Sequence, residues 1–384
     1  MSSRAEILAP TLAAADVRAL RVIALWSMLG AKMLAGWGVQ WDIRWHLVIG
    51  RDSFWIAPHL MTYTGVTLAA VLAFGVLAWE TWRAQRGLEG PDAIRVMGLT
   101  GTRGFHLAWW GMAITILAAP VDDLWHRLFG IDVTLWSPPH LLGIVGAQVN
   151  TIGCLAIALE LWAPGRRRRL GPLLVASLLL LGAFQITVDP AIHTAFRRGG
   201  VFFFAWAMLG GLAFSFTLVL AARLTGLRSA PLLAALGALA FHWIGLEVSN
   251  VGFALVQPTP AIAEAIAADP DSPIALAHEM ARRNGTTTAG RATALRYLPV
   301  LPAALLALID ARRRWVGGVV ALALGLMAVS GWLFARLPAL SHALPSVLDV
   351  AVAVPLAVVA ALAGGAAAVG LARVLEPHQS TRPA

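Results

Sequence analysis

Residues 41–59 read WDIRWHLVIGRDSFWIAPH, and this stretch joins the end of one long apolar segment to the start of the next. It carries Asp42, His46 and His59 in a D-x3-H-x12-H arrangement. One carboxylate and two imidazoles at the junction of two apolar segments form a potential metal chelate at the edge of a membrane. The junction therefore bears on both the fold and the function of the chain.

A second copy of this stretch follows later in the sequence. Residues 122–140 read DDLWHRLFGIDVTLWSPPH and place Asp122, His126 and His140 in the same order, with one extra residue before the last histidine. A match of this length predicts that a whole helix–loop–helix unit is duplicated in tandem.

The composition places the chain in a membrane. Apolar residues make up 59% of its 384 residues and charged residues only 13%, whereas soluble domains carry roughly 25% charged residues. A water-soluble core cannot bury so much apolar surface, so the expected surroundings are lipid. The single cysteine, Cys154, excludes a disulfide framework and a thiolate metal cluster. The net charge of +9 does not indicate a nucleic-acid partner, because most arginines lie in short loops between apolar segments.

The hydropathy pattern predicts an all-α protein, a polytopic integral membrane helix bundle with about ten transmembrane helices. The candidate spans cover residues 20–40, 59–80, 105–121, 140–162, 171–188, 201–222, 231–257, 294–310, 316–335 and 347–371. They divide the chain into a cytoplasmic N-terminal segment, the duplicated two-helix units that carry the triads, six further transmembrane helices and a cytoplasmic tail, at residues 1–19, 20–163, 164–371 and 372–384. The outer loop at 258–293 contains PIALAHEMARR, residues 273–283, which is typical of a short amphipathic helix at a membrane surface.

The placement of arginines predicts the orientation. Alternate loops hold most of them, namely Arg83, Arg86, Arg95, Arg103, Arg166 to Arg169, Arg223, Arg228 and Arg312 to Arg314. By the positive-inside rule these loops and both termini are cytoplasmic, in a bacterial-type inner (plasma) membrane. The bias is a majority and not a clean split, because the opposite loops hold Arg197, Arg198, Arg282, Arg283 and Arg291. Both triads then lie on the extracytoplasmic side, in parallel repeats related by an axis along the membrane normal.

The spacing explains how each triad is assembled. Asp42 and His46 are four residues apart, so they share one face at a helix end. His59 follows Pro58, a residue suited to the first turn of the next helix, and Ser137 is the expected N-cap in the second copy. Each hairpin thus brings two residues from one helix end next to one histidine from the next helix start. Such a set can chelate copper(II), iron(II) or zinc.

Further residues are candidates for supporting or completing these sites. Asp52 and Asp132 are expected to accept hydrogen bonds from ligand imidazoles, and Arg51 could pair with Asp52. Asp189 and His193 repeat the D-x3-H spacing and are candidates to close a site that the two copies begin. The alternative for all of these residues is an ordinary interfacial belt, since Trp, His and Asp are common where water is near.

Three ionisable residues lie within predicted spans: Lys32, His242 and Glu247. Such residues are functional candidates because a charge in hydrocarbon is costly. The alternative is a structural role, in which a pair such as Lys32 with Glu247 ties two helices together.

The residues between the histidines of the first copy resemble a known family. The run WHLVIGRDSFWIAPHLMTY, residues 45–63, is similar to the C subunit of the copper membrane monooxygenases, the particulate methane and ammonia monooxygenases. That family has an Asp-x3-His-x12-His copper site with an Arg-Asp-Thr/Ser-x-Phe run between the histidines. The resemblance implies copper ligands at Asp42, His46 and His59, and it places Arg51, Asp52 and Tyr63 at neighbouring positions.

Several features depart from the family pattern. Phe54 stands one place early, and the second copy has Ile131 where the first has Arg51. No part of the chain resembles the cupredoxin-bearing B subunit of those enzymes. The doubling of the motif leaves two metal sites or one shared site as alternatives.

The resemblance implies a copper-dependent monooxygenase, or one of its subunits, that oxidises a small apolar molecule with dioxygen. Copper is the expected cofactor, and iron or zinc are the alternatives. The repeats and the intramembrane ionisable residues also fit a transporter of a metal or small solute. A third alternative is a non-catalytic structural subunit of a membrane complex. Membrane lipid is the expected partner in each case, alongside partner subunits or a homo-oligomer.

Overall fold

The computed structural model describes residues 3–50, 53–129, 135–288 and 294–376, without the side chains of residues 3–16, 126 and 294. The described chain is an all-α bundle, as the sequence predicts. Among the described residues the only strands are β1 (Ile94–Val96) and β2 (Leu99–Gly101), which form a small antiparallel hairpin.

Two helical hairpins open the fold. The first consists of α1 (Ser3–Val48) and α2 (Ala57–Ala84), and the second consists of α3 (Arg103–Phe129) and α4 (Pro138–Leu161). The remaining helical elements are α5 (Arg167–Val188), α6 (Pro190–Arg198), η1 (Gly200–Phe204), α7 (Ala205–Thr225), α8 (Ala230–Val256), α9 (Ile262–Ala268), α10 (Pro273–Arg283), α11 (Ala294–Tyr297), α12 (Val300–Ile309), α13 (Trp315–Phe334), η2 (Ser341–Ala343) and α14 (Val347–Leu375).

Nine helical segments of the described chain are long and apolar enough to cross a membrane, and they match nine of the predicted spans. The remaining predicted span, 294–310, is interrupted instead of continuous: α11 ends before Pro299 and α12 begins after it. A proline cannot supply the backbone N–H that a continuous helix needs there. The ten residues of α12 rise only about 15 Å, which is half of the roughly 30 Å hydrocarbon core.

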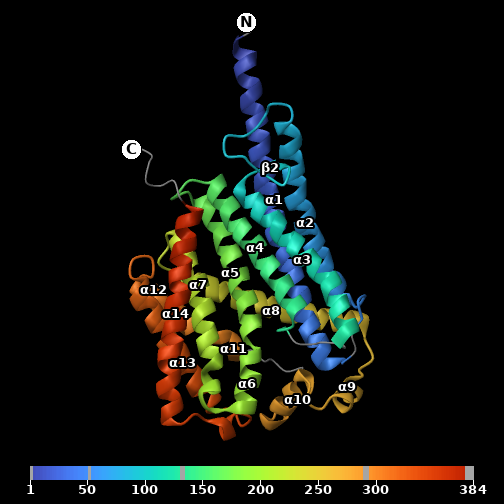
Figure 1. Cartoon of the computed structure of the whole chain (residues 1–384), viewed down its shortest axis with the longest axis vertical. Coiled ribbons are helices and arrows are strands. Elements are labelled where there is room, and N and C mark those ends of the chain that lie inside the picture. Colours follow the sequence, from blue (N-terminus) through green and yellow to red (C-terminus); the bar gives the residue numbers. More distant parts are fainter. Residues whose placement is uncertain (1–2, 51–52, 130–134, 289–293, 377–384) are drawn as a thin grey trace.

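The connections gather at two opposite ends of the bundle. The start of α1, the end of α14, the β-hairpin and the α4–α5 connection lie at one end, which we call the termini end (Figure 1). The end of α1, the start of α2, the end of α3 and the start of α4 lie at the other, which we call the triad end, together with α9 and α10 (Figure 1). Both predicted triads therefore belong to the same end of the bundle.

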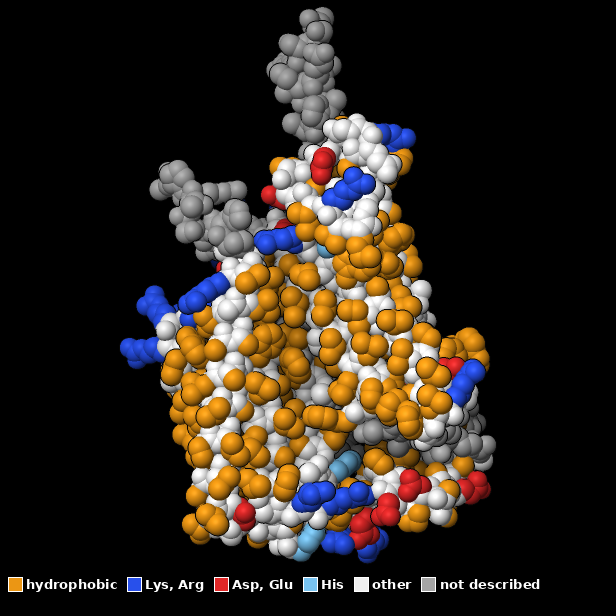
Figure 2. Space-filling model, in the orientation of Figure 1, with side chains coloured by type: hydrophobic (Ala, Val, Ile, Leu, Met, Phe, Trp, Pro, Cys, Tyr) orange, Lys and Arg blue, Asp and Glu red, His pale blue; other side chains and the backbone are white. Residues whose placement is uncertain are grey.

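The side walls of the bundle are apolar. Figure 2 shows a broad belt of hydrophobic side chains between the two ends, where the charged side chains gather. Large apolar side chains such as Ile23, Val71 and Val359 are each more than 60% exposed on these walls. Hydrocarbon is the medium that such a surface requires, so the walls are expected to contact membrane lipid.

Small residues bring the two helices of the first hairpin into close contact. A Cβ atom added at Gly65 of α2 would meet the backbone of Ala31 and Ala35 of α1 at less than 3.0 Å. Nearer the triad end, a Cβ added at Gly38 of α1 would collide with Thr62 of α2. Close backbone approach of this kind is the usual basis of helix association in lipid, where helices gain no hydrophobic energy by leaving the solvent.

The second hairpin crosses in the same way. A Cβ added at Gly146 of α4 would meet the Gly111 carbonyl oxygen and the Thr115 backbone nitrogen of α3, both at 2.6 Å. Gly143, one turn nearer the triad end, faces Ala118 of α3. Each hairpin is thus closed by a glycine contact near its middle and a second small-residue contact beside its connection.

The hairpin contact can be tested with a matched pair of glycines on α2. We expect Gly65→Ala to lower the free energy of unfolding by about 1–3 kcal/mol, because the added methyl group overpacks the crossing. Gly75→Ala should be neutral or stabilising by up to about 1 kcal/mol, because nothing lies within 4 Å of its added Cβ. Thermal unfolding of both variants in detergent measures the difference, and equal melting temperatures would contradict the crossing.

Candidate metal centre

The first triad is assembled by the end of α1 and the start of α2. Asp42 and His46 lie one turn apart in the last turns of α1. His59 lies in the first turn of α2, directly after Pro58. The three side chains each offer one ligand atom, and these atoms lie within 4.8 Å of one another. Among the described residues, this is the one group of three or more His, Cys, Asp or Glu side chains that is arranged in this way.

The distances within the group suit a metal ion. Asp42 Oδ1 lies 3.1 Å from His59 Nε2 and 3.6 Å from His46 Nε2. Two ligand atoms that each lie about 2.0–2.2 Å from one ion are themselves about 3.0–3.5 Å apart at tetrahedral or right angles. The three side chains are 16–22% exposed, so they are reachable from the triad end without lying in bulk water.

Aromatic packing fixes the rotation of α1 at this end. Trp41 and Trp45 are buried on the face of α1 that packs on α8. Trp45 stacks on Phe253 with ring centroids 5.9 Å apart, and the Trp41 ring lies directly over Gly252. Large buried rings hold a helix in one orientation. The ligand residues of α1, which lie on another face, are thereby held toward α2.

The elements α9 and α10 cover the end of α1. The Ala261 backbone N–H donates a hydrogen bond of 2.7 Å to the Ile49 carbonyl. His278 Nε2 lies 2.9 Å from the Leu47 carbonyl oxygen, which also accepts from the Thr288 hydroxyl. These contacts satisfy carbonyls that every helix leaves unpaired at its C-terminal end. His278 was not a predicted site residue, and only the folding of α10 back over α1 reveals its position.

The helix α10 coincides with the amphipathic helix predicted from PIALAHEMARR. Its Ser272 N-cap accepts a hydrogen bond from the Ala275 N–H. Next to His278, hydrogen bonds from Arg282 and Arg283 hold the pKa of the Glu279 carboxyl below its usual value. The Glu279 carboxylate is about a third exposed, and it therefore stays ionised at neutral pH. Both of its oxygens accept hydrogen bonds from these two arginines.

Tyr63 borders the triad. It lies one turn along α2 from His59, with ring centroids 5.7 Å apart, and Phe54 packs on its other side at 4.9 Å. The position that the family resemblance assigns to the tyrosine is therefore next to a ligand imidazole. Arg51 and Asp52, which were expected beside it, lie outside the described residues.

The second triad is described in part. Asp122 near the end of α3 faces His140 in the first turn of α4, with 3.5 Å between Oδ1 and Nε2, and each side chain is about a third exposed. The side chain of His126 and the whole of Asp132 lie outside the described residues. Ser137 occupies the predicted N-cap position, but its hydroxyl accepts no cap hydrogen bond. Two of the three predicted ligands are thus placed together in the same manner as in the first copy.

Asp189 and His193 lie elsewhere at the triad end. Asp189 stands between α5 and α6, and its Oδ2 pairs with Arg296 Nη2 at 2.8 Å. His193 follows one turn later in α6, and the described residues contain no metal-like group that includes it. The guanidinium supplies the Asp189 carboxylate with a cation, so a metal is not needed to balance its charge. The sequence could not reveal this partner, which is 107 residues away.

Lys32 does not form the pair with Glu247 that was considered from the sequence. Its ammonium group donates a hydrogen bond of 2.8 Å to the Ala147 carbonyl oxygen. The contact runs from α1 to α4, so it links the first hairpin to the second. A polar group that finds a partner inside a bundle ties helices together in lipid.

The polar residues of α8 also face α1. His242 Nδ1 lies 3.2 Å from the Gln40 side-chain oxygen. Glu247 accepts a hydrogen bond from Asn250, whose own oxygen accepts from Arg44 at 2.9 Å. Arg44 was not singled out from the sequence, although a charged residue two places after the first ligand is a signal that could have been used.

Comparison of the chain with protein-family models, with curated proteins and with solved structures finds no match.

The role of Asp189 can be tested through its arginine. We expect Arg296→Gln to lower the free energy of unfolding by about 1–3 kcal/mol, because it leaves a partly buried carboxylate without a cation. The double variant Asp189→Asn/Arg296→Gln should recover most of this loss. Denaturation in detergent measures both. A fall in bound metal for Asp189→Asn alone, with no stability change for Arg296→Gln, would instead identify Asp189 as a ligand.

Proposed function

We propose that the chain is an integral membrane protein that binds one transition-metal ion, preferably copper, through Asp42, His46 and His59. The convergence of these three ligand atoms within 4.8 Å at the mouth of a helical hairpin carries the proposal. Two imidazole nitrogens and one carboxylate oxygen suit copper(II), iron(II) or zinc, and the family resemblance of residues 45–63 favours copper.

The donor set favours an open site over a closed structural one. Three protein ligands leave at least one coordination position for water or a substrate, whereas structural zinc sites are closed by four protein ligands. When bound, copper would supply dioxygen chemistry for the hydroxylation of a small apolar molecule. Insertion of one oxygen atom into a C–H bond and reduction of the other to water also requires two electrons, which an external electron donor must supply, and two protons, which come from water. The chain's own residues hold and orient the ion, and the apolar walls admit a lipophilic substrate from the bilayer.

We further propose that the two hairpins are copies of one unit. The glycine crossings support this, because Gly65 and Gly146 occupy corresponding positions and each lies over the corresponding turn of its partner helix. Asp122 and His140 would then form part of a second metal site. The arginine bias supports a cytoplasmic termini end and an extracytoplasmic triad end in an inner (plasma) membrane.

A transport function has less support. Its main basis in the sequence was the set of intramembrane ionisable residues, and each of these now has a local partner. Lys32 holds a carbonyl of α4, and His242 lies beside a side chain of α1. In a transporter, ionisable groups along the pathway must be free to contact the substrate. Side chains that already bond to neighbouring helices do not meet this requirement.

The test is the metal content of the purified protein after removal of metal and refilling with copper, iron or zinc. Wild type is expected to retain copper at one or two equivalents. His46→Ala/His59→Ala should lose the ion from the first site, because a single remaining carboxylate cannot chelate it. His126→Ala/His140→Ala reports whether a second equivalent depends on the other copy.

His342→Ala is the matched control, since this histidine also lies at the triad end but contacts the Phe196 carbonyl. Its metal content should equal that of wild type. Unchanged copper in His46→Ala/His59→Ala, or an equal loss in His342→Ala, would count against the proposed site.

A further inference from the structure

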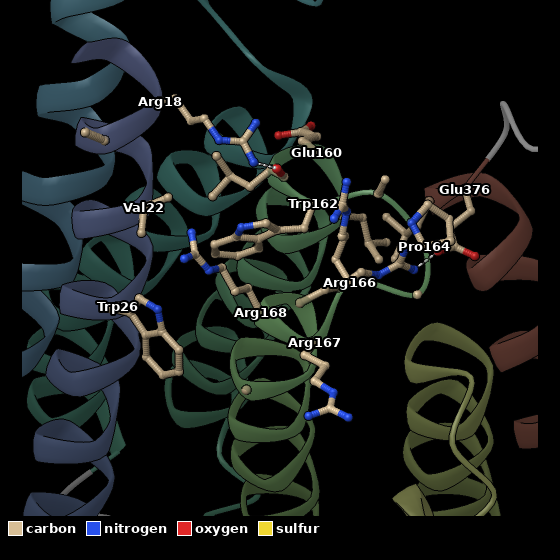
Figure 3. Close-up of a pocket in the computed structure, with 18 of the residues that line it drawn as sticks. Arg18, Val22, Trp26, Glu160, Trp162, Pro164, Arg166, Arg167, Arg168 and Glu376 are labelled. Carbon is tan, nitrogen blue, oxygen red and sulfur yellow. Dashed lines mark hydrogen bonds and ion pairs between the residues drawn. The ribbon is translucent and has the colours of Figure 1, made fainter. Parts of the chain in front are cut away.

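A basic groove opens at the termini end, far from the triads. It is lined by α1, the α4–α5 connection, the start of α5 and the end of α14 (Figure 3). Four exposed arginines surround it: Arg18 of α1 and the consecutive Arg166, Arg167 and Arg168. None of the proposed metal ligands takes part in this groove.

The acidic residues of the groove are already engaged. Glu160 accepts hydrogen bonds from the Thr102 hydroxyl at 2.6 Å and the Gly104 N–H at 2.8 Å. Glu376 pairs with Arg169, which is buried and also donates to a backbone carbonyl. Among the described side chains, no carboxylate pairs with Arg166 to Arg168. The groove therefore presents an excess of positive charge at the level where the bundle leaves the hydrocarbon.

The α1 wall of the groove is apolar. Val22, Ile23 and Trp26 of α1 line it, and Ile23 and Trp26 are 63% and 44% exposed. The Trp26 ring lies against Gly171 of α5, where an added Cβ would stand 3.0 Å from it, so the ring spans the gap between the two helices. From Arg18 to Trp26 the helix rises about 12 Å. Tryptophan is enriched at the boundary between headgroups and hydrocarbon.

We propose that this groove binds an anionic phospholipid, with the headgroup phosphate among Arg18 and Arg166 to Arg168 and an acyl chain along Ile23 and Trp26. Guanidinium groups match phosphate oxygens in geometry as well as in charge. The first turn of α5, which starts at Arg167, adds backbone N–H groups that attract anions. A free phosphate would leave the exposed apolar wall uncovered, whereas a phospholipid covers both parts. Basic pockets between transmembrane helices bind such headgroups in other membrane proteins.

The test uses the full chain in mild detergent and counts bound lipid by native mass spectrometry during titration with phosphatidylglycerol. Phosphatidylcholine should bind more weakly, because its headgroup has no net charge. We expect Arg167→Gln/Arg168→Gln to weaken phosphatidylglycerol binding about 30-fold. The matched control is Arg313→Gln/Arg314→Gln, which removes two consecutive exposed arginines from another loop and should leave binding unchanged.

Two further measurements complete the test. One distinguishes a phospholipid from a soluble phosphate compound as the ligand, and the other detects variants that fail to fold. Trp26→Ala should weaken phosphatidylglycerol binding about tenfold without changing the binding of soluble glycerol phosphate. Melting temperatures of all variants identify any loss of fold, in which case Arg18→Gln replaces the double variant. Equal affinity for glycerol phosphate and the lipid, an effect of the control pair as large as that of Arg167→Gln/Arg168→Gln, or no effect of any variant would each overturn the proposal.

Discussion

The close approach of α1 and α2 is the contact on which the candidate centre depends. In hydrocarbon a helix pair gains little from hiding apolar surface, so it is held by tight packing of small residues. Gly38 lies one turn before Asp42 and touches the turn of α2 that contains Pro58 and Thr62. That contact sets the height of His59 against the end of α1. A side chain at Gly38 would separate the helices one turn away from the three ligand atoms.

Polar contacts then close each hairpin and join the two hairpins to each other. Asn150 of α4 donates to the Ala108 carbonyl of α3 at 2.8 Å, and Arg21 of α1 forms two hydrogen bonds of 2.7 Å with Glu80 of α2. Lys32 adds the link from α1 to α4. Because unsatisfied polar groups are costly in lipid, each of these contacts is selective for one arrangement of the helices. Arg21, Glu80 and Lys32 thus have a structural explanation.

The sequence predicted the structure correctly where the determining residues lie close together in the chain. Apolar length predicted nine of the spans, and the four-residue spacing of Asp42 and His46 together with Pro58 predicted how the first triad would form. The sequence did not predict contacts between residues that are distant in the chain. The pairing of Asp189 with Arg296 and the contact of His278 with the end of α1 depend on how separate helices pack, and no spacing rule contains that information. The interruption of the span at 294–310 is an intermediate case, because Pro299 stands in the sequence but apolar length alone does not show that it breaks the helix.

The helix α1 connects the two proposed sites. Arg18 in the basic groove and Asp42 in the candidate metal centre are 24 residues apart on this helix, which corresponds to about 36 Å along its axis. The hydrocarbon core is about 30 Å thick, so α1 is long enough to place the two residues just beyond its opposite faces. In that position each charged group would have water within reach, which would remove most of the desolvation cost of an ionised side chain in a membrane protein. The length of one continuous helix thus accounts for an aspartate that can bind a cation at one interface and arginines that can bind an anion at the other.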